Sequence, residues 1–260
     1  SAGAAAVGGQ QRSSGGGEGA AARRRFLDRL TFGFHIGHAT HVSAYEQVMR
    51  ERLRLLREGQ IDRSWLDALE EKMAEHGAAI AASRLEMAEH LNRACEAATG
   101  PFSGAHIDVD GILERWLEEG PALAVEEKFK ETLIRNRGLD AGTGTTTVGP
   151  HKSDLIVKQI EKGLPASQCS TGEQKALLIA VLLANTRLQA SERRLTPLLL
   201  LDEAVAHLDP RKRSELYNEI LELGAQAWFS GTDEKLFSEF GGNAQFVRII
   251  DGTIQQYQTH

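Results

Sequence analysis

Residues 198–209, "LLLLDEAVAHLD", decide the fold class of this chain. The four consecutive leucines from Leu198 to Leu201 are typical of a strand buried on both faces of a parallel sheet. Asp202 and Glu203 follow directly, so we expect them at the carboxyl end of that strand, where such sheets bind ligands. The stretch therefore predicts an α/β fold with an acidic site at one edge of its sheet.

A second polar motif precedes this strand. Residues 170–174 read "STGEQ" and lead into a helix predicted over residues 175–189. Such a helix start points backbone N–H groups and the positive end of the helix dipole outward, and Ser170 and Thr171 add hydroxyl donors. Two interpretations stay open: an anion site, or an ordinary N-cap in which Glu173 completes a capping box.

The acid pair suits phosphoryl chemistry. Asp202 can hold Mg²⁺ directly or through water, and Glu203 can orient and deprotonate a water that attacks a phosphoryl group. Two acids after a strand can also be a plain loop start. Their place after "STGEQ" argues against that alternative.

Composition sets the limits. With 260 residues and 41% hydrophobic residues, the chain can form one large domain or two smaller ones. Cys95 and Cys169 are too few and too far apart for a disulfide framework or a zinc site, which fits a reducing, cytoplasmic setting. The longest apolar run, residues 176–184, is far shorter than the ~20 residues of a membrane span. A net charge of −6 argues against a uniformly basic nucleic-acid binder but leaves room for a local basic stripe.

The composition changes along the chain and predicts three parts. Residues 1–22 are rich in Gly, Ala and Ser and predict a flexible tail. Because the sequence has no initiator Met, we interpret it as a fragment or a processed chain, with a natural disordered leader as the alternative. Residues 23–140 predict a mainly helical lobe, and residues 141–260 predict an α/β lobe.

The helical lobe contains two long helical patterns. The first covers residues 43–59, with Ser43 as the expected N-cap and Gly59 as the stop. The second, over residues 64–98, predicts a helix roughly 50 Å long that packs against the first. Later predicted elements are a strand at 106–109, a helix at 122–137 and a strand from 154 to 157.

Three arginines fall on one face of the first helix. Arg50, Arg54 and Arg57 are spaced i, i+4 and i+7. They form either a solvated face paired with Glu46 and Glu58, or a surface that contacts DNA phosphates. The second interpretation predicts contacts to the backbone only, without reading of bases.

The motifs resemble those of ABC ATPases. "STGEQ" is similar to the signature LSGGQ, "LLLLDE" to Walker B, and the run ending at Asp209 to the D-loop. The segments "RRRFLDRL", "VGPHKSDL" and "QAWFSGTD" accompany these motifs, and all of them appear in the order expected of the RecF family. The chain therefore resembles this family, whose members are recombination-mediator ATPases related to the SMC proteins. The resemblance runs from about Arg23 to the end of the chain and implies a partial ABC/SMC-like P-loop NTPase head with a helical second lobe.

The resemblance also implies a function. It implies a DNA repair and recombination protein that supports replication and the SOS response, and that binds single-stranded, gapped and linear duplex DNA in an ATP-dependent manner. The implied partners are DNA, a second copy in an ATP-dependent homodimer, and recombination mediator proteins. The family carries an N-terminal P-loop, and these 260 residues contain no GxxxxGK[ST]. We therefore expect weak ATPase activity of the complete protein and none of this chain alone.

The resemblance assigns roles to residues at a composite site for ATP and Mg²⁺. It implies that Asp202 serves Mg²⁺, that Glu203 is the catalytic base and that Asp209 couples the two sites of the dimer. The signature turn of one subunit would contact the γ-phosphate held by the other. The residues implied there are Ser170, Thr171, Gly172 and Gln174.

Some positions depart from the family pattern. The signature reads Gly-Glu at 172–173 in place of Gly-Gly, Ser153 stands where an acid is usual, and Thr232 stands in the slot of the ABC switch histidine. An alternative function is a non-catalytic SMC-like partner that lends "STGEQ" to the nucleotide of another subunit. Such a partner has no need of the acid pair, which argues against it.

Overall fold

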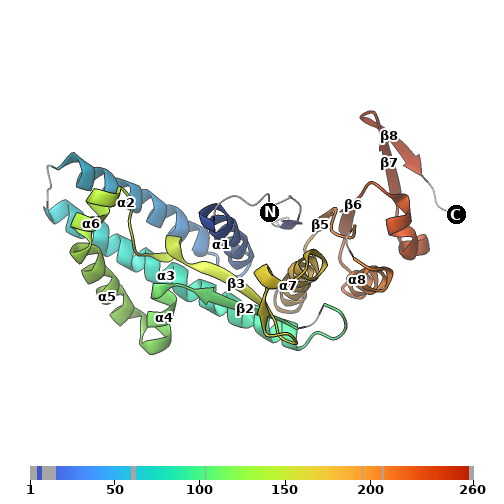
Figure 1. Cartoon of the computed structure of the whole chain (residues 1–260), viewed down its shortest axis with the longest axis horizontal. Coiled ribbons are helices and arrows are strands. Elements are labelled where there is room, and N and C mark those ends of the chain that lie inside the picture. Colours follow the sequence, from blue (N-terminus) through green and yellow to red (C-terminus); the bar gives the residue numbers. More distant parts are fainter. Residues whose placement is uncertain are drawn as a thin grey trace.

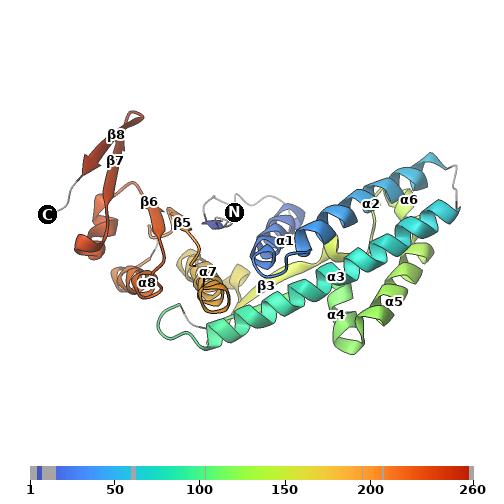
Figure 2. The ribbon, with the colours of Figure 1, turned by 180° about the vertical axis from the view of Figure 1, so that it is seen from behind.

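The computed structural model describes residues 5–7, 16–59, 63–102, 104–194, 196–206 and 208–257. The molecule is elongated (Figure 1). Long helices fill one end, and a β-hairpin lies at the other; the reverse view shows the same order (Figure 2).

The elements alternate between helices and short strands. The helices are α1 (Gly16–Phe32), α2 (His38–Glu58), α3 (Arg63–Glu96), α4 (Ile112–Glu119), α5 (Ala122–Arg135), α6 (Arg137–Thr143), α7 (Thr171–Arg193) and α8 (Pro210–Glu222). The strands are β1 (Ala5–Val7), β2 (Ala105–Asp110), β3 (Asp154–Gln159), β4 (Leu164–Pro165), β5 (Leu199–Asp202), β6 (Ala227–Ser230), β7 (Phe246–Ile250) and β8 (Thr253–Tyr257). Short 3-10 helices are η1 (Pro150–Lys152), η2 (Ala166–Gln168) and η3 (Glu234–Asn243).

The predicted leucine strand is β5, the middle strand of a parallel sheet ordered β1-β5-β6. Leu199 and Leu201 are buried on one face, as expected. Leu200 lies on the other face and is only half-buried by the described residues. The prediction that the strand is buried on both faces is therefore wrong for the face of Leu200. β2, β3 and β4 form an antiparallel sheet, and β7 pairs with β8.

The two predicted long helices are α2 and α3, and they pack against each other. Gly59 ends α2 with a φ of 70°, a left-handed conformation that glycine adopts without strain. The prediction of Ser43 as N-cap is wrong, because α2 begins at His38. The His38 ring is buried between Asp28 and Ser83, with nitrogen–oxygen distances of 2.9 and 2.6 Å, and these contacts fix the helix start further upstream.

α3 contributes to every hydrophobic cluster of the described chain. Met87 and Leu91 belong to the largest cluster, which also includes α7 and β5. Met73 packs in the second cluster with α5, and Leu66 packs in the third with the end of α2. This one helix therefore joins the helical end of the molecule to the sheet.

The predicted flexible tail is partly helical. α1 begins at Gly16, so the prediction is wrong for residues 16–22, where alanines, the strongest helix formers, extend the helix backwards. An ion pair of 2.6 Å between Arg23 and Asp154 anchors α1 on β3. Residues 5–7 form β1, whereas residues 1–4 and 8–15 of the predicted tail lie outside the described residues. The division at residue 140 stays a prediction; β2 and β3 pair across it.

Candidate functional site

The predicted acid pair lies at the carboxyl end of β5, as expected. Asp202 and Glu203 are both exposed there. Ser230, the last residue of the neighbouring strand β6, donates its hydroxyl to Asp202. The backbone N–H of Glu203 donates to the Ser230 carbonyl at 3.2 Å and lies 3.3 Å from its hydroxyl oxygen. Two adjacent strand ends thus position both acids.

Glu203 has a strained backbone. Its φ is 49°, a left-handed conformation that costs a non-glycine residue about 1–3 kcal/mol. Lys175, the fifth residue of α7, donates its ammonium to the Glu203 carbonyl at 3.1 Å. With the contact to Ser230, this hydrogen bond holds the residue in its unusual conformation. Such strain is typical of functional sites.

The signature turn forms a complete capping box. Ser170 is the N-cap of α7: its hydroxyl accepts from the Glu173 N–H at 3.4 Å, and the Glu173 carboxylate accepts from the Ser170 N–H at 2.8 Å. The contact to Lys162, and then those to Ser170, lower the pKa of Glu173 to about 2, so this carboxylate is ionised at neutral pH. The capping-box interpretation is confirmed, and the anion-site interpretation stays a prediction.

The other predicted nucleotide residues lie around the same helix starts. Thr171 is exposed in the first turn of α7, and Gly172 beside it is half-buried. Gln174 is turned back on its own loop, where its amide donates to the Cys169 carbonyl at 3.0 Å. Asp209 is the N-cap of α8; the hydrogen bond that it accepts from the Lys212 N–H, 3.0 Å long, lowers its pKa.

The acids at β5 fit a magnesium ion shared with a nucleotide. Among the described residues, no group of three or more His, Cys, Asp or Glu side chains is placed to hold a metal ion. Asp202 offers one exposed carboxylate beside the Ser230 hydroxyl. Mg²⁺ is typically held by one or two carboxylates together with phosphates and water, so this donor set suits it.

The predicted arginine face is partly paired. Arg50 lies 3.7 Å from Glu46, and Arg54 lies 2.9 Å from Glu58, as in the solvated-face interpretation. Arg57 instead donates to a backbone carbonyl of the loop after α6, at 2.7 Å. The exposed pairs are worth little energy and can exchange for phosphates, so DNA contact stays a prediction.

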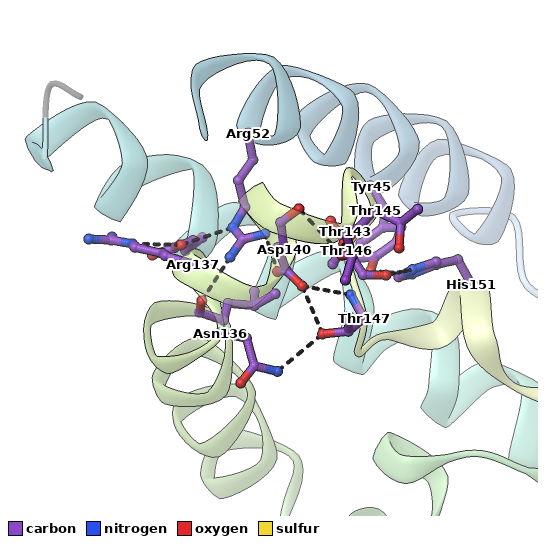
Figure 3. A network of polar contacts seen from close by, with 12 residues as sticks. Tyr45, Arg52, Asn136, Arg137, Asp140, Thr143, Thr145, Thr146, Thr147 and His151 are labelled. Atoms are coloured by element: carbon purple, nitrogen blue, oxygen red, sulfur yellow. Dashed lines mark hydrogen bonds and ion pairs between the residues drawn. The ribbon is translucent and has the colours of Figure 1, made fainter. Parts of the chain in front are cut away.

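Sequence reasoning missed a buried ionic network next to this face (Figure 3). Arg52 is fully buried, and it donates to Glu70 at 2.9 Å and to Asp140 at 2.7 Å. Asp140 in turn accepts from the N–H and the hydroxyl of Thr147, at 2.9 and 2.7 Å. The spacing of residues could have revealed this network. Arg52 follows buried Tyr45 by seven residues and so lies on the same apolar face of α2, where an arginine needs buried ionic partners.

The structure gives Ser153 a partner. Its hydroxyl donates to the buried carboxyl of Glu114 at 2.8 Å. Burial raises the pKa of Glu114. An acid at position 153, as in the usual family pattern, would place a second carboxyl against Glu114, so serine suits this chain.

No helix among the described residues has both the length and the apolar character that a bilayer crossing requires. No protein-family model matches the chain. Curated relatives do match it. Their shared name is "DNA replication and repair protein RecF", and the sequence from Mesorhizobium japonicum is 46% identical over 232 residues, 88% of this chain and 61% of the relative. The Brucella abortus sequence is 45% identical over the same share of this chain and 60% of the relative. This chain thus spans about 60% of the length of these relatives.

Solved structures show the same fold. The chain is similar to the recombination mediator protein RecF of the RecFOR pathway, solved as RecF-ATPrS, with a TM-score of 0.75 and 22% identity over 92% of this chain and 63% of that one. RecF-ATP gives a TM-score of 0.73 over the same shares. The predicted α/β class, a partial ABC/SMC-like P-loop NTPase head with a helical lobe, is confirmed. By its sequence identity to the curated relatives, and in agreement with this fold, the chain belongs to the RecF family.

Proposed function

We propose that this chain supplies the signature and catalytic-acid parts of a composite ATP site in a RecF-type DNA repair protein, and that ATP-dependent dimerisation controls its binding to DNA. The observation that carries the proposal is the acid pair at the end of β5, where Lys175 of the signature helix and Ser230 of β6 hold Glu203 in place. The solved relatives named as ATP complexes support the cofactor.

The proposal gives each motif one task. Asp202 carries the charge for Mg²⁺, which, when bound, would neutralise the phosphates. Glu203 orients the attacking water and takes its proton. Ser170 and Thr171 offer hydroxyls at the positive end of α7 to the γ-phosphate held by a second copy, and Asp209 couples the two sites.

The test uses a chimaera in which the N-terminal segment of the Mesorhizobium japonicum RecF precedes this chain. Glu203→Gln should still bind Mg²⁺–ATP, while turnover falls ~10²–10⁴-fold, because the variant lacks the base. Asp202→Asn should first weaken magnesium-dependent ATP binding. Unchanged turnover in Glu203→Gln would contradict the catalytic assignment.

Dimerisation tests the signature turn separately. Ser170→Arg in the same chimaera should leave ATP affinity of the monomer nearly unchanged and block the ATP-dependent dimer, as size-exclusion chromatography would show. Normal dimerisation of this variant would refute the composite site. The chain alone has no GxxxxGK[ST] and should bind ATP poorly; micromolar affinity in equilibrium binding would refute this expectation.

DNA binding is tested in the presence of Mg²⁺–ATP with the same chimaera and its Arg50→Ala, Arg54→Ala, Arg57→Ala triple variant. If these arginines contact phosphates, the variant should lose affinity for DNA by about the same factor for every sequence. On duplex DNA, the slope of log affinity against log salt should fall by ~0.9 per lost contact. An unchanged slope would show that the three side chains do not contact phosphates and would favour the solvated-face interpretation.

A further inference from the structure

A small pocket lies in the helical lobe, between α2 and the loop that joins α6 to β3. Its volume is about 140 Å³. Its lining residues are Met49, Arg50 and Leu53 from α2, and Gly144, Thr145, Thr146, His151 and Lys152 from the loop and η1. None of the loop residues has a role in the ATP site proposed above.

The loop wall of this pocket is rigidly held. Asp140, fixed by buried Arg52, accepts two hydrogen bonds from Thr147 (Figure 3). Gly149 packs so closely on α2 that a Cβ there would lie 2.1 Å from the Tyr45 hydroxyl. His151 is also fully engaged, since its Nε2 donates to the Thr146 carbonyl at 2.8 Å and its Nδ1 accepts from Tyr45 at 2.9 Å.

One hydroxyl in the lining has no hydrogen-bond partner among the described residues. Thr146 is only 3% exposed, and its Oγ1 is buried without a partner. A buried polar atom without a hydrogen-bond partner costs free energy, so its presence in a folded protein calls for an explanation. A bound ligand that accepts a hydrogen bond would satisfy this hydroxyl.

The rim of the pocket is positively charged. In the described part of the chain, no carboxylate lies within ion-pair distance of Lys152. Arg50 has one exposed partner, Glu46, at 3.7 Å. Burial first, and then the charges of Lys152 and Arg24, lower the pKa of His151 to about 4, so this neighbouring ring is neutral and the surroundings are electropositive. The lining of the pocket thus includes two exposed cations, Lys152 and Arg50, and the residue that carries the unsatisfied hydroxyl, Thr146.

We propose that this pocket binds a phosphate of the DNA backbone. Lys152 and Arg50 pair with the negative charge of the phosphate, and the Thr146 hydroxyl donates a hydrogen bond to one of its oxygens. Met49 and Leu53 supply an apolar wall for the adjoining sugar. The contact fixes the position of the DNA without reading its sequence. The inference rests on the DNA binding proposed above and adds a site to it.

The test measures binding of labelled duplex and single-stranded DNA to the chimaera described above, with Mg²⁺–ATP present, by fluorescence anisotropy over a range of salt. Lys152→Ala should weaken binding to all sequences and lower the duplex salt slope by ~0.9. Thr146→Val keeps the shape but removes the hydroxyl, so it should weaken binding several-fold with the slope unchanged. Because this valine removes an unsatisfied buried polar atom, its thermal midpoint should not fall, which separates lost contact from unfolding.

Lys235→Ala is the matched control. Its ammonium has no hydrogen-bond or ion-pair partner among the described residues, and it lies in η3, far along the chain from the pocket. If the unsubstituted chimaera binds DNA and both pocket variants bind like this control, the pocket assignment is wrong and the DNA proposal stands. If the unsubstituted chimaera binds no DNA in the presence of Mg²⁺–ATP, both fail. Binding of ATP that depends on Lys152 would overturn the DNA assignment in favour of a nucleotide.

Discussion

The ammonium of Lys175 lies 3.1 Å from the backbone carbonyl oxygen of Glu203 and thereby joins the signature helix to the end of β5. Glu203 carries a left-handed backbone there. The same residue that we propose as the base is therefore held by α7, whose first residues we propose to face a second subunit. A change at the signature turn can thus reach the acid through one side chain.

Lys175→Met should lower the free energy of unfolding by about 1 kcal/mol, because it removes one charge-assisted hydrogen bond. Urea unfolding at pH 7 measures the change. Lys235→Met is the control and should shift the midpoint little, since its ammonium has no hydrogen-bond or ion-pair partner in the described part of the chain. Equal shifts in both variants would show that the Lys175 contact contributes nothing to stability.

Glu203→Gly should stabilise the chain by about 0.5–1 kcal/mol, because glycine adopts a φ of 49° without strain. The exposed side chain contributes little packing. Glu222→Gly, at the end of helix α8, is the matched control and should destabilise by up to about 1 kcal/mol. Destabilisation by Glu203→Gly of the same size would disprove the strain argument.

Arg52→Met should cost about 3–5 kcal/mol of stability, because it leaves the buried Asp140 carboxylate without its guanidinium partner. Glu70 would keep its contact to Arg137 at 2.5 Å. Arg54→Met, one half-turn along the same helix but exposed, should change stability by less than about 0.5 kcal/mol. Chemical unfolding of the two variants side by side distinguishes them.

Stability should fall as the pH decreases from about 6.5 towards 4. The pKa of His151 is about 4 in the folded chain, below its ordinary value of 6.5, so the unfolded chain takes up the proton first. The contribution is on the order of 3 kcal/mol at about 1.4 kcal/mol per pKa unit, fully present above pH 6.5. His151→Asn removes the titrating group, and its unfolding free energy should depend less on pH over this range. An identical pH profile would rule out His151 as the cause.

Gly149→Ala should destabilise the chain strongly, because φ is 146° and the new Cβ would lie 2.1 Å from the Tyr45 hydroxyl. Gly138→Ala is the control, since a Cβ at this position in α6 meets no atom within 4 Å. It should be neutral or stabilising by up to about 1 kcal/mol. Thermal unfolding of both variants gives the comparison.

Local pattern predicted the parts of the site that depend on neighbours in sequence. Leu198 to Leu201 with the following acids predicted β5 and its end, and "STGEQ" predicted the capped start of α7. Contacts between distant segments could not be read in this way. The Lys175 contact to Glu203 spans 28 positions and the Arg52 contact to Asp140 spans 88, and neither leaves a periodic signal.

The same limit explains the errors. Ser43 is a good N-cap by its chemistry, yet the buried contacts of His38 place the start of α2 earlier. Half-exposed Leu200 looks identical to its neighbours in sequence, and only the layers above the sheet decide its burial.

The length of α3 has a mechanical consequence. Its 34 residues form one continuous helix, and the two ends of this helix pack in different hydrophobic clusters. At ~1.5 Å per residue, a rotation of about 5° at the Glu96 end moves the Arg63 end by about 4 Å. A modest tilt near the sheet is therefore magnified at the far tip of the molecule, where it becomes a displacement larger than the length of a hydrogen bond.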